Sequence, residues 1–235
     1  MFEPVKIAPS ILSADFMHLG RDIELIERAG AGYVHVDVMD GHFVPNLTMG
    51  VPVVKQLKKA TDLPLDVHLM ISNPLTQLSW FLDVGADIIT VHAEALDADG
   101  LARAIAAIHA AGAKAAVALK PRTAPGVLAP VIADVDMVLV MSVEPGFSGQ
   151  SYIEGSDAKV ARVVQMARTV GTSPLIQVDG GMGVGTAPLV AAAGADVLVC
   201  GNAVFAADDP AAALAAVQVA ADEARMSALS AAKEA

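Results

Sequence analysis

The chain has 235 residues, a length that fits either two small domains or one α/β barrel. It carries 15 basic and 26 acidic residues for a net charge of −11, and 54% hydrophobic residues give it enough apolar surface to bury a large core, which excludes disorder as its main state. The acidic balance also excludes the basic surface on which nucleic-acid binding depends, so we expect no nucleic-acid partner.

The mean hydropathy of +0.55 is high, but the apolar runs of the sequence are short and interrupted. A membrane-spanning helix needs about 18 or more consecutive apolar residues, so we expect no membrane partner. The single cysteine, Cys200, excludes an intramolecular disulfide framework and a cysteine-based zinc site. Because the N-terminus also lacks the pattern of a secretory signal, the sequence predicts a cytoplasmic protein.

A short glycine-containing stretch recurs between segments of helical pattern and β-branched apolar runs. Its glycines are Gly30, Gly85, Gly112 and Gly194, and their separations of 55, 27 and 82 residues are close to two, one and three times 27. A glycine just past the last helical residue ends a helix because it adopts a left-handed conformation at low cost. A repeating strand-plus-helix unit of about 27 residues is therefore predicted, and the chain has room for about eight.

Eight apolar runs alternate with segments of helical periodicity. The predicted strands are 5–9, 33–38, 65–70, 88–92, 115–119, 137–141, 175–178 and 197–200. The predicted helices are 15–29, 50–60, 74–84, 100–111, 127–133, 156–170, 186–193 and 211–224. Strands that are apolar throughout are covered on both faces, as parallel strands are. The fold class predicted is α/β, a (β/α)₈ TIM barrel with residues 1–235 as one domain and a frayed helical tail from about residue 223.

Polar residues stand at the ends of three predicted strands, where the chemistry of such barrels takes place. Alternation along a strand places His35 and Asp37 on one face, and His68 and Asp179 end two further strands. Any one of these histidines, taken alone, is also explained as a hydrogen-bonded barrel residue. Their shared register favours one divalent metal ion, Zn²⁺ foremost, with Fe²⁺, Mn²⁺ or Co²⁺ as alternatives.

The two aspartates suggest a reaction as well as a ligand set. A metal that holds a carbonyl and a neighbouring hydroxyl oxygen acidifies the C–H between them and stabilises the resulting enediolate. One base suffices to move a proton along one face, whereas inversion of a centre needs an acid/base group on each face. Asp37 and Asp179 come from different sides of the predicted ring, so they are candidates for that pair. The alternative is that both only ligate the metal.

Other residues at the strand ends are candidates to line the site. Met39, Met70 and Met141 each end a strand, and they are read either as ordinary core or as a soft apolar lining for the enediolate. His92 ends the fourth strand and could also line the site, whereas His109 is expected on the surface.

Glycine-rich loops follow the last three predicted strands and suggest an anion site. They contain Gly146 and Gly149 after the sixth strand, Gly180 and Gly181 after the seventh, and Gly201 after the eighth. These loops are the usual phosphate site of such barrels, because their backbone N–H groups point at the anion. The alternative is that they are ordinary turn glycines. In a chain of net charge −11, local N–H groups have to outweigh the overall repulsion.

From Ile7 to about Asp209 the sequence closely resembles the ribulose-phosphate 3-epimerase family. The resemblance lies in the segments 8–16, 35–46, 66–70, 145–150 and 178–181, of which the second and fourth are the most specific. It implies a (β/α)₈ barrel of the pentose phosphate pathway that interconverts D-ribulose 5-phosphate and D-xylulose 5-phosphate. It also implies a metal held by His35, Asp37, His68 and Asp179, with the two aspartates as the acid/base pair.

The resemblance extends to the substrate contacts and to assembly. It implies that Ser10 and His68 contact the substrate, and it suggests dimers or hexamers of this chain. It further implies a phosphate site formed by Gly146, Phe147, Ser148, Gly149, Gly180, Gly181, Gly201 and Asn202.

Five positions depart from the usual family pattern. They are Lys120, Glu144, Ser148, Gln177 and Asn202. None is a metal ligand or a catalytic aspartate, so the exact sugar phosphate is left open rather than the reaction, with D-allulose 6-phosphate or a four-carbon ketose phosphate as alternatives. Two more remote readings are an aldolase or decarboxylase that uses Lys120 as a Schiff base, and a sugar-phosphate-binding barrel without activity.

Overall fold

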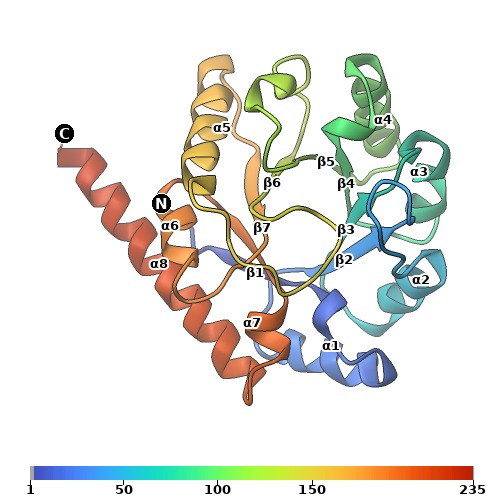
Figure 1. The fold of residues 1–235 in the computed structure, drawn as a ribbon, viewed down its shortest axis with the longest axis horizontal. Coiled ribbons are helices and arrows are strands. Elements are labelled where there is room, and N and C mark those ends of the chain that lie inside the picture. Colours follow the sequence, from blue (N-terminus) through green and yellow to red (C-terminus); the bar gives the residue numbers. More distant parts are fainter. Residues whose placement is uncertain (1–2, 235) are drawn as a thin grey trace.

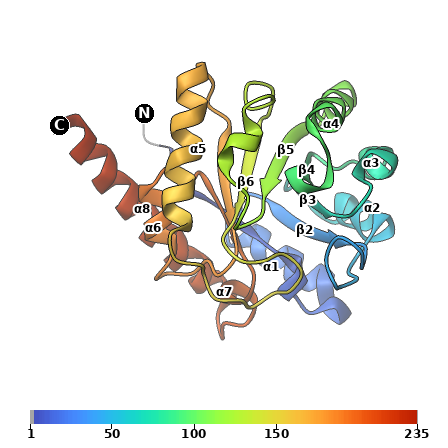
Figure 2. The same cartoon turned by 45° about the horizontal axis from the view of Figure 1, so that its top comes forward.

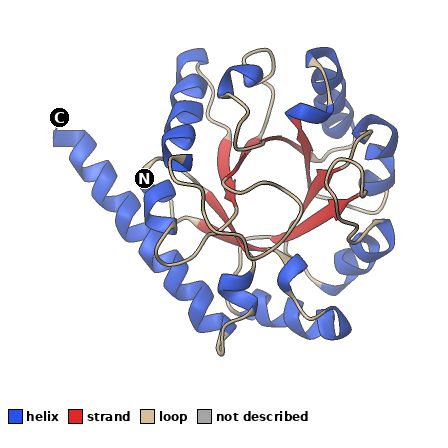
Figure 3. Cartoon of the chain, viewed as in Figure 1, coloured by secondary structure: helices blue, strands red, loops and turns tan. Residues whose placement is uncertain are grey.

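The computed structural model describes residues 3–234, which form one closed ring of parallel strands surrounded by helices (Figures 1 and 3). The strands follow the ring in the order β1-β8-β7-β6-β5-β4-β3-β2, and a parallel bridge between Ser10 and His35 joins β1 to β2. Their bounds are β1 Lys6–Pro9, β2 Val34–Met39, β3 Leu65–Met70, β4 Ile88–His92, β5 Lys114–Leu119, β6 Met137–Met141, β7 Leu175–Asp179 and β8 Val197–Cys200. The predicted (β/α)₈ barrel is confirmed.

The helices cover the outer surface of the ring. Their bounds are α1 Leu19–Arg28, α2 Val51–Ala60, α3 Pro74–Leu82, α4 Ala98–Ala110, α5 Ser156–Val170, α6 Ala187–Ala192, α7 Asn202–Phe205 and α8 Pro210–Glu234. Short 3₁₀ helices are η1 Ile11–Ser13, η2 Phe16–His18, η3 Ala93–Ala95 and η4 Pro125–Leu128. Figure 2, a tilted view, shows the end of α8 extending away from the barrel beside α5.

Both faces of the strands are buried, which explains their continuous apolar runs. The outward side chains pack with the helices in one large core that includes Val36, Leu69 and Val140. Inside the ring, an apolar layer that includes Tyr33 and Ile88 fills the amino-terminal end of the barrel. Polar side chains occupy the interior above this layer, and they include the buried His35, Asp66, His68, Thr90 and Gln177. The ring therefore encloses a packed interior whose polarity rises toward the carboxyl ends of the strands.

Three aspartates close the amino-terminal end of the barrel in the same way. Each stands just before an even-numbered strand, accepts a hydrogen bond from a backbone N–H near the start of the preceding strand, and pairs with a basic side chain. The sets are Asp87 with Leu65 and Lys58, Asp136 with Ala115 and His109, and Asp196 with Ile176 and Arg225. His109 is thus on the surface, as predicted, and this end of the barrel is fixed by hydrogen bonds that satisfy strand N–H groups.

One predicted helix is wrong. The segment 127–133 is not an α-helix, because the chain between β5 and β6 forms only η4 followed by turns. Pro130 provides no N–H for an α-helix, and it also disfavours the helical conformation at Ala129. The N–H groups of Ala129 and Val131 bond three residues back, to Gly126 and Leu128, as in a 3₁₀ turn.

The larger remaining differences from the sequence-based expectation are two helix boundaries and one additional helix. The segment predicted as one helix from residue 15 begins as η2, and α1 starts only at Leu19. The short α7 was not predicted. The last helix, expected to end at residue 224 with a frayed tail from about 223, continues as α8 to Glu234. Alanine-rich segments have high helix propensity, so nothing in this sequence stops the helix earlier.

Over residues 3–234 we find no helix with the length and apolar character needed to cross a bilayer. Met1 and Phe2, which begin the segment expected to carry no secretory signal, lie outside the described residues.

We expect Asp136→Ala to lower the free energy of unfolding by about 1–3 kcal/mol, the usual cost of leaving a buried group without its partner. The group left without a carboxylate acceptor is the N–H of Ala115, a residue that is fully buried. Equilibrium urea denaturation measures the change, and Asp134→Ala on the same exposed turn is the matched control. Equal losses in the two variants would contradict this role for Asp136.

Candidate active site

Four side chains from three strands meet inside the carboxyl end of the barrel. His35 and Asp37 lie on β2, His68 lies on β3 and Asp179 ends β7. One potential ligand atom from each of them lies within 4.8 Å of all the others. Asp37 Oδ1 is 3.4 Å from His35 Nε2 and 3.0 Å from His68 Nδ1, and Asp179 Oδ2 is 4.0 and 3.9 Å from the same two nitrogens. The convergence predicted from strand register is therefore present.

The donor set of this cluster fits a divalent cation. His35 Nδ1 is 2.7 Å from Asp66 Oδ2, which also accepts a hydrogen bond from Gln177 Nε2. Because a carboxylate only accepts, the neutral ring of His35 carries its proton on Nδ1 and presents the lone pair of Nε2 to the cluster. That Nε2 is buried and has no hydrogen-bond partner among the described residues. Two aspartates and an unpartnered imidazole nitrogen are ligands that Zn²⁺ and similar ions accept.

The carboxylates and imidazoles of the cluster shift the pKa values of one another. Burial lowers the pKa of His35, but the carboxylates of Asp66 and Asp37 outweigh it and raise this pKa well above its ordinary value. Burial raises the pKa of Asp37, but the neighbouring imidazoles of His35 and His68 bring it well below the usual range. Burial, together with the charge of Asp37, raises the pKa of Asp179 to about 6. The environment therefore shifts the pKa values of Asp37 and Asp179 in opposite directions, which is a common arrangement in acid/base sites.

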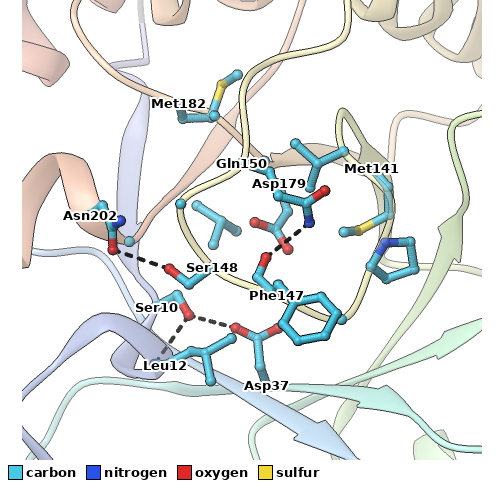
Figure 4. Close-up of a pocket in the computed structure, with 18 of the residues that line it drawn as sticks. Ser10, Leu12, Asp37, Met141, Phe147, Ser148, Gln150, Asp179, Met182 and Asn202 are labelled. Atoms are coloured by element: carbon cyan, nitrogen blue, oxygen red, sulfur yellow. Dashed lines mark hydrogen bonds between the residues drawn. The ribbon is translucent and has the colours of Figure 1, made fainter. Parts of the chain in front are cut away.

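A cavity of about 240 Å³ opens beside the cluster (Figure 4). Asp37 and Asp179 border it, and Ser10 Oγ donates a 2.5 Å hydrogen bond to Asp37 Oδ2. Every other non-histidine residue proposed from the sequence as a substrate contact also lines it, namely Met39, Met70, Met141, Gly146, Phe147, Ser148, Gly149, Gly180, Gly181, Gly201 and Asn202. His35 and His68 do not line the cavity and belong to the adjoining cluster of candidate metal ligands.

The loop between β6 and α5 passes over the middle of the ring (Figure 1) and packs on the turn after β7. Gly180 has φ of 120°, and a Cβ atom there would lie 2.8 Å from the backbone nitrogen of Val143. Gly181 has φ of 63°, and its Cβ would collide with the backbone of Tyr152. The close approach of two loops requires glycine at both positions, which accounts for the Gly-Gly pair without invoking an anion.

Hydroxyl and amide groups join the loops on the cavity wall. Ser148 Oγ lies 2.5 Å from Ser13 Oγ and donates to Asn202 Oδ1 at 3.2 Å, which links the loops after β1, β6 and β8. Gln150 Nε2 donates to the carbonyls of Glu144 and Phe147, which holds the β6 loop in its turn. Two of the five unusual positions, Ser148 and Asn202, therefore support each other.

Lysine and arginine are absent from the described residues that line this cavity. Lys120, considered as a Schiff-base residue, does not line the cavity, and its Nζ lies 3.8 Å from the centre of the Phe43 ring. Glu144, another unusual position, is exposed, and its carboxylate lies 3.8 Å from Arg122. An anion in this cavity would have to rely on backbone N–H groups, hydroxyls and amides.

Several residues of the site were not predicted from the sequence. Leu12, Val143, Gln150 and Met182 also line the cavity, together with Pro145, Val199 and Ala203. Asp66, the partner of His35, stands two residues before His68 and shares its face of β3, so strand alternation could have indicated it. Val199 lies on β8, Ala203 on α7 and Leu12 on η1. The remaining residues lie in loops, where no periodicity places a side chain.

The fold and the site together define a class: a (β/α)₈-barrel protein with a two-histidine, two-aspartate candidate metal centre at the carboxyl ends of its strands. Residues 6–205 match the model of the "Ribulose-phosphate 3 epimerase family". The chain belongs to the ribulose-phosphate 3-epimerase family and is therefore an isomerase.

Curated relatives from distant organisms are similar over most of their length. The ribulose-phosphate 3-epimerase of Bacillus subtilis is 50% identical over 206 residues, which cover 87% of this chain and 94% of the relative. The chloroplastic ribulose-5-phosphate-3-epimerase of Arabidopsis thaliana is 47% identical, with 87% and 73% covered. The ribulose-phosphate 3-epimerase of Methanocaldococcus jannaschii is 47% identical, with 87% and 86% covered.

Two solved structures share the fold at low sequence identity. The crystal structure of 3-hexulose-6-phosphate synthase aligns with a TM-score of 0.63 and 22% identity, covering 93% of this chain and 99% of that one. The crystal structure of KGPDC from Streptococcus mutans aligns with a TM-score of 0.69 and 15% identity, covering 94% and 99%. At these identities the likeness concerns the barrel fold alone.

We expect His35→Ala to weaken binding of one equivalent of Co²⁺ or Zn²⁺ by more than the roughly 10–100-fold that loss of an outer hydrogen-bond partner costs. The variant removes a nitrogen whose lone pair faces the cluster. Titration of metal-stripped protein against a competing chelator gives the affinity, and His109→Ala, a surface histidine at the other end of the barrel, is the control. Unchanged affinity in His35→Ala would exclude this ligand.

Proposed function

We propose that this chain interconverts D-ribulose 5-phosphate and D-xylulose 5-phosphate by inverting C3, as a step of the pentose phosphate pathway. The observation that carries the proposal is the joint presence of the His35, Asp37, His68 and Asp179 cluster and about 50% identity to a curated ribulose-phosphate 3-epimerase over most of the chain. The same pair of observations argues against a non-catalytic barrel, because both candidate acid/base groups are intact.

His35, Asp37, His68 and Asp179 would hold one divalent ion, with Zn²⁺ as the first candidate and Fe²⁺, Mn²⁺ or Co²⁺ as alternatives. Such an ion supplies Lewis acidity toward the ketose oxygens, which makes the C3 proton more acidic. The buried, unpartnered Nε2 of His35 supports this assignment.

Asp37 and Asp179 are proposed as the two acid/base groups, one for each face of the substrate. One carboxylate removes the C3 proton to give an enediolate, and the other returns a proton to the opposite face. Both border the cavity, and they enter it from β2 and β7, which are not neighbours in the ring. The Ser10 hydroxyl donates a hydrogen bond to Asp37 Oδ2 and so orients this carboxylate, which borders the cavity.

The remaining walls would serve binding and exclusion of water. Met39, Met70 and Met141 form an apolar lining that offers no competing proton to the enediolate. The phosphate is proposed to bind along the segments 146–149, 180–181 and 201–202, through backbone N–H groups and the side chains of Ser148 and Asn202. The lack of lysine and arginine along the described part of this wall supports a site built from backbone and neutral groups.

We also infer a homo-oligomer, either a dimer or a hexamer, that works in the cytoplasm. Exposed apolar side chains support assembly, since Phe16 is 57% and Met17 is 86% accessible. The one cysteine is a buried free thiol, which is consistent with a reducing compartment. Sedimentation velocity of the purified chain tests the assembly, and a monomer at micromolar concentration would contradict it.

Incubation of the purified protein with D-ribulose 5-phosphate in D₂O is expected to yield D-xylulose 5-phosphate with deuterium at C3. NMR detects both outcomes, and metal-stripped protein is the control. A panel with D-allulose 6-phosphate and a four-carbon ketose phosphate tests the alternatives by comparison of kcat/KM. Absence of exchange with every ketose phosphate would overturn the proposed reaction.

We expect Asp179→Asn to lower kcat by at least the 10²–10⁴-fold that a general acid/base group typically supplies. The amide retains the shape of the carboxylate but neither accepts nor returns a proton near neutral pH. Circular dichroism and the urea midpoint check that the variant is folded. Activity close to that of the unmodified chain would contradict the two-base assignment.

A further inference from the structure

A third histidine and a glutamate stand behind the candidate metal ligand His68. His92 ends β4, and its Nε2 lies 2.9 Å from His68 Nε2. On the other side of its ring, His92 Nδ1 lies 3.0 Å from Glu94 Oε2 in η3. Both histidines are fully buried. Glu94, His92 and His68 therefore form a continuous hydrogen-bonded chain that ends at the cluster.

The direction of donation along these hydrogen bonds is set at Glu94. Its two carboxylate oxygens can only accept, and Oε1 already accepts the backbone N–H of Lys120 at 2.8 Å. His92 must then donate from Nδ1 to Oε2, so a neutral His92 has a bare Nε2. A hydrogen bond between two Nε2 atoms needs one proton, and that proton must belong to His68. With its proton on Nε2, His68 presents a lone pair at Nδ1.

Nδ1, the His68 nitrogen that carries this lone pair, is the one that faces the cluster. His68 Nδ1 lies 3.0 Å from Asp37 Oδ1 and 3.9 Å from Asp179 Oδ2. If the proton sat on Nδ1 instead, His68 would donate to Asp37 and could not act as a ligand. The tautomer of His68 thus decides between a hydrogen bond inside the cluster and a free ligand position.

The other histidine of the cluster is fixed by a different device. His35 donates Nδ1–H directly to the carboxylate of Asp66, which is the common arrangement behind a metal-bound histidine. The partner of His68 is instead the imidazole of His92, and the carboxylate of Glu94 contacts His92 rather than His68. Phe43 packs against His92, with ring centres 4.8 Å apart, and keeps its ring in position.

We propose that Glu94 and His92 are positioning residues that fix His68 in the tautomer protonated at Nε2, and that they thereby make Nδ1 a metal ligand. This inference rests on the proposed metal site and adds two residues to it. Neither Glu94 nor His92 lines the cavity, so both act through His68 and not through the substrate.

The direct test is the protonation pattern of the histidines in the intact, Zn²⁺-loaded protein. In a long-range ¹H–¹⁵N spectrum of ¹⁵N-histidine-labelled chain, we expect His68 to carry its proton on Nε2 and His92 to carry its proton on Nδ1. The spectra of the His92 variants assign the signals. A proton on Nε2 of His92 would overturn the proposal.

Three variants test the consequence for metal affinity. His92→Leu removes the acceptor, and we expect Zn²⁺ affinity to fall about 10–100-fold, as is typical for an outer partner of a ligand. His92→Gln keeps an amide oxygen that can accept from His68, so its affinity is expected to return close to that of the unmodified chain. In Glu94→Gln, one amide oxygen replaces the two oxygens that accept from His92 and from the backbone N–H of Lys120. The NH₂ group of the glutamine can then donate to His92 and reverse the direction of the hydrogen bonds to His68. We expect this substitution to weaken binding.

The two positions should depend on each other. Glu94→Gln is expected to lower metal affinity when residue 92 is histidine and to have little effect in the His92→Gln background. His109→Leu, which breaks a histidine–aspartate pair on the surface, is the matched control and should leave the affinity unchanged. Failure of the unmodified chain to bind Zn²⁺ would refute the metal site itself. Normal Zn²⁺ affinity in folded His92→Leu or Glu94→Gln would refute only the positioning role.

Discussion

The interior of this barrel is organised around a buried group of carboxylates and imidazoles whose arrangement fits a divalent cation. Asp37, Asp66 and Asp179 place three carboxylates in the upper half of the ring, where His35 and His68 also lie. Desolvation of carboxylates in such a place is costly unless positive charge or hydrogen-bond donors compensate them. Asp66 Oδ2 accepts hydrogen bonds from His35 and Gln177, and Asp37 Oδ2 accepts one from Ser10. The position between Asp37, Asp179 and the imidazole nitrogens fits a divalent cation.

The two ends of the barrel have separate tasks. At the amino-terminal end, Asp87, Asp136 and Asp196 each satisfy a strand N–H and a basic side chain, and they contribute to stability. At the carboxyl end, polar atoms are arranged around a cavity, and His35 Nε2 in the adjoining cluster is among the buried polar atoms that have no hydrogen-bond partner within the described residues. This division is general for barrels of parallel strands, because the loops that follow the strands vary without disturbing the ring. A destabilising substitution and an inactivating one are therefore expected at opposite ends of the molecule.

The strongly acidic character of the chain shapes the cavity as well. A net charge of −11 repels an anionic sugar, and no lysine or arginine of the described cavity wall offsets this repulsion locally. Neutral groups on three loops remain, and the loops are joined through Ser13, Ser148 and Asn202. Gly180 and Gly181 are required first by the close packing of these loops on one another. The same packing brings the backbone of the loops to the cavity, so a structural requirement and a binding role coincide at these glycines.

Much of the molecule could be predicted from the sequence, because parallel strands leave a strong pattern. Continuous apolar runs, repeated every 27 residues or so and separated by glycine, determined the eight strands and the barrel. Alternation along β2 and β3 then placed His35, Asp37 and His68 on the inner face, and the segment resemblance identified the family. The local pattern was insufficient between β5 and β6, where Pro130 prevents an α-helix, and at the C-terminus, where no residue signals the end of α8.

Only the tertiary structure decided which polar groups touch. Asp66 and Gln177 stand 111 residues apart and meet across the interior, and Glu94 acts on His68 through His92. Closure of the ring sets these distances, and they leave no periodic signal in the sequence. The residues that line the cavity from loops, such as Gln150 and Met182, escaped prediction for the same reason. Sequence by itself therefore determined the scaffold and the candidate ligands, whereas the hydrogen-bonded partners that fix the tautomers of those ligands follow from the three-dimensional closure of the barrel.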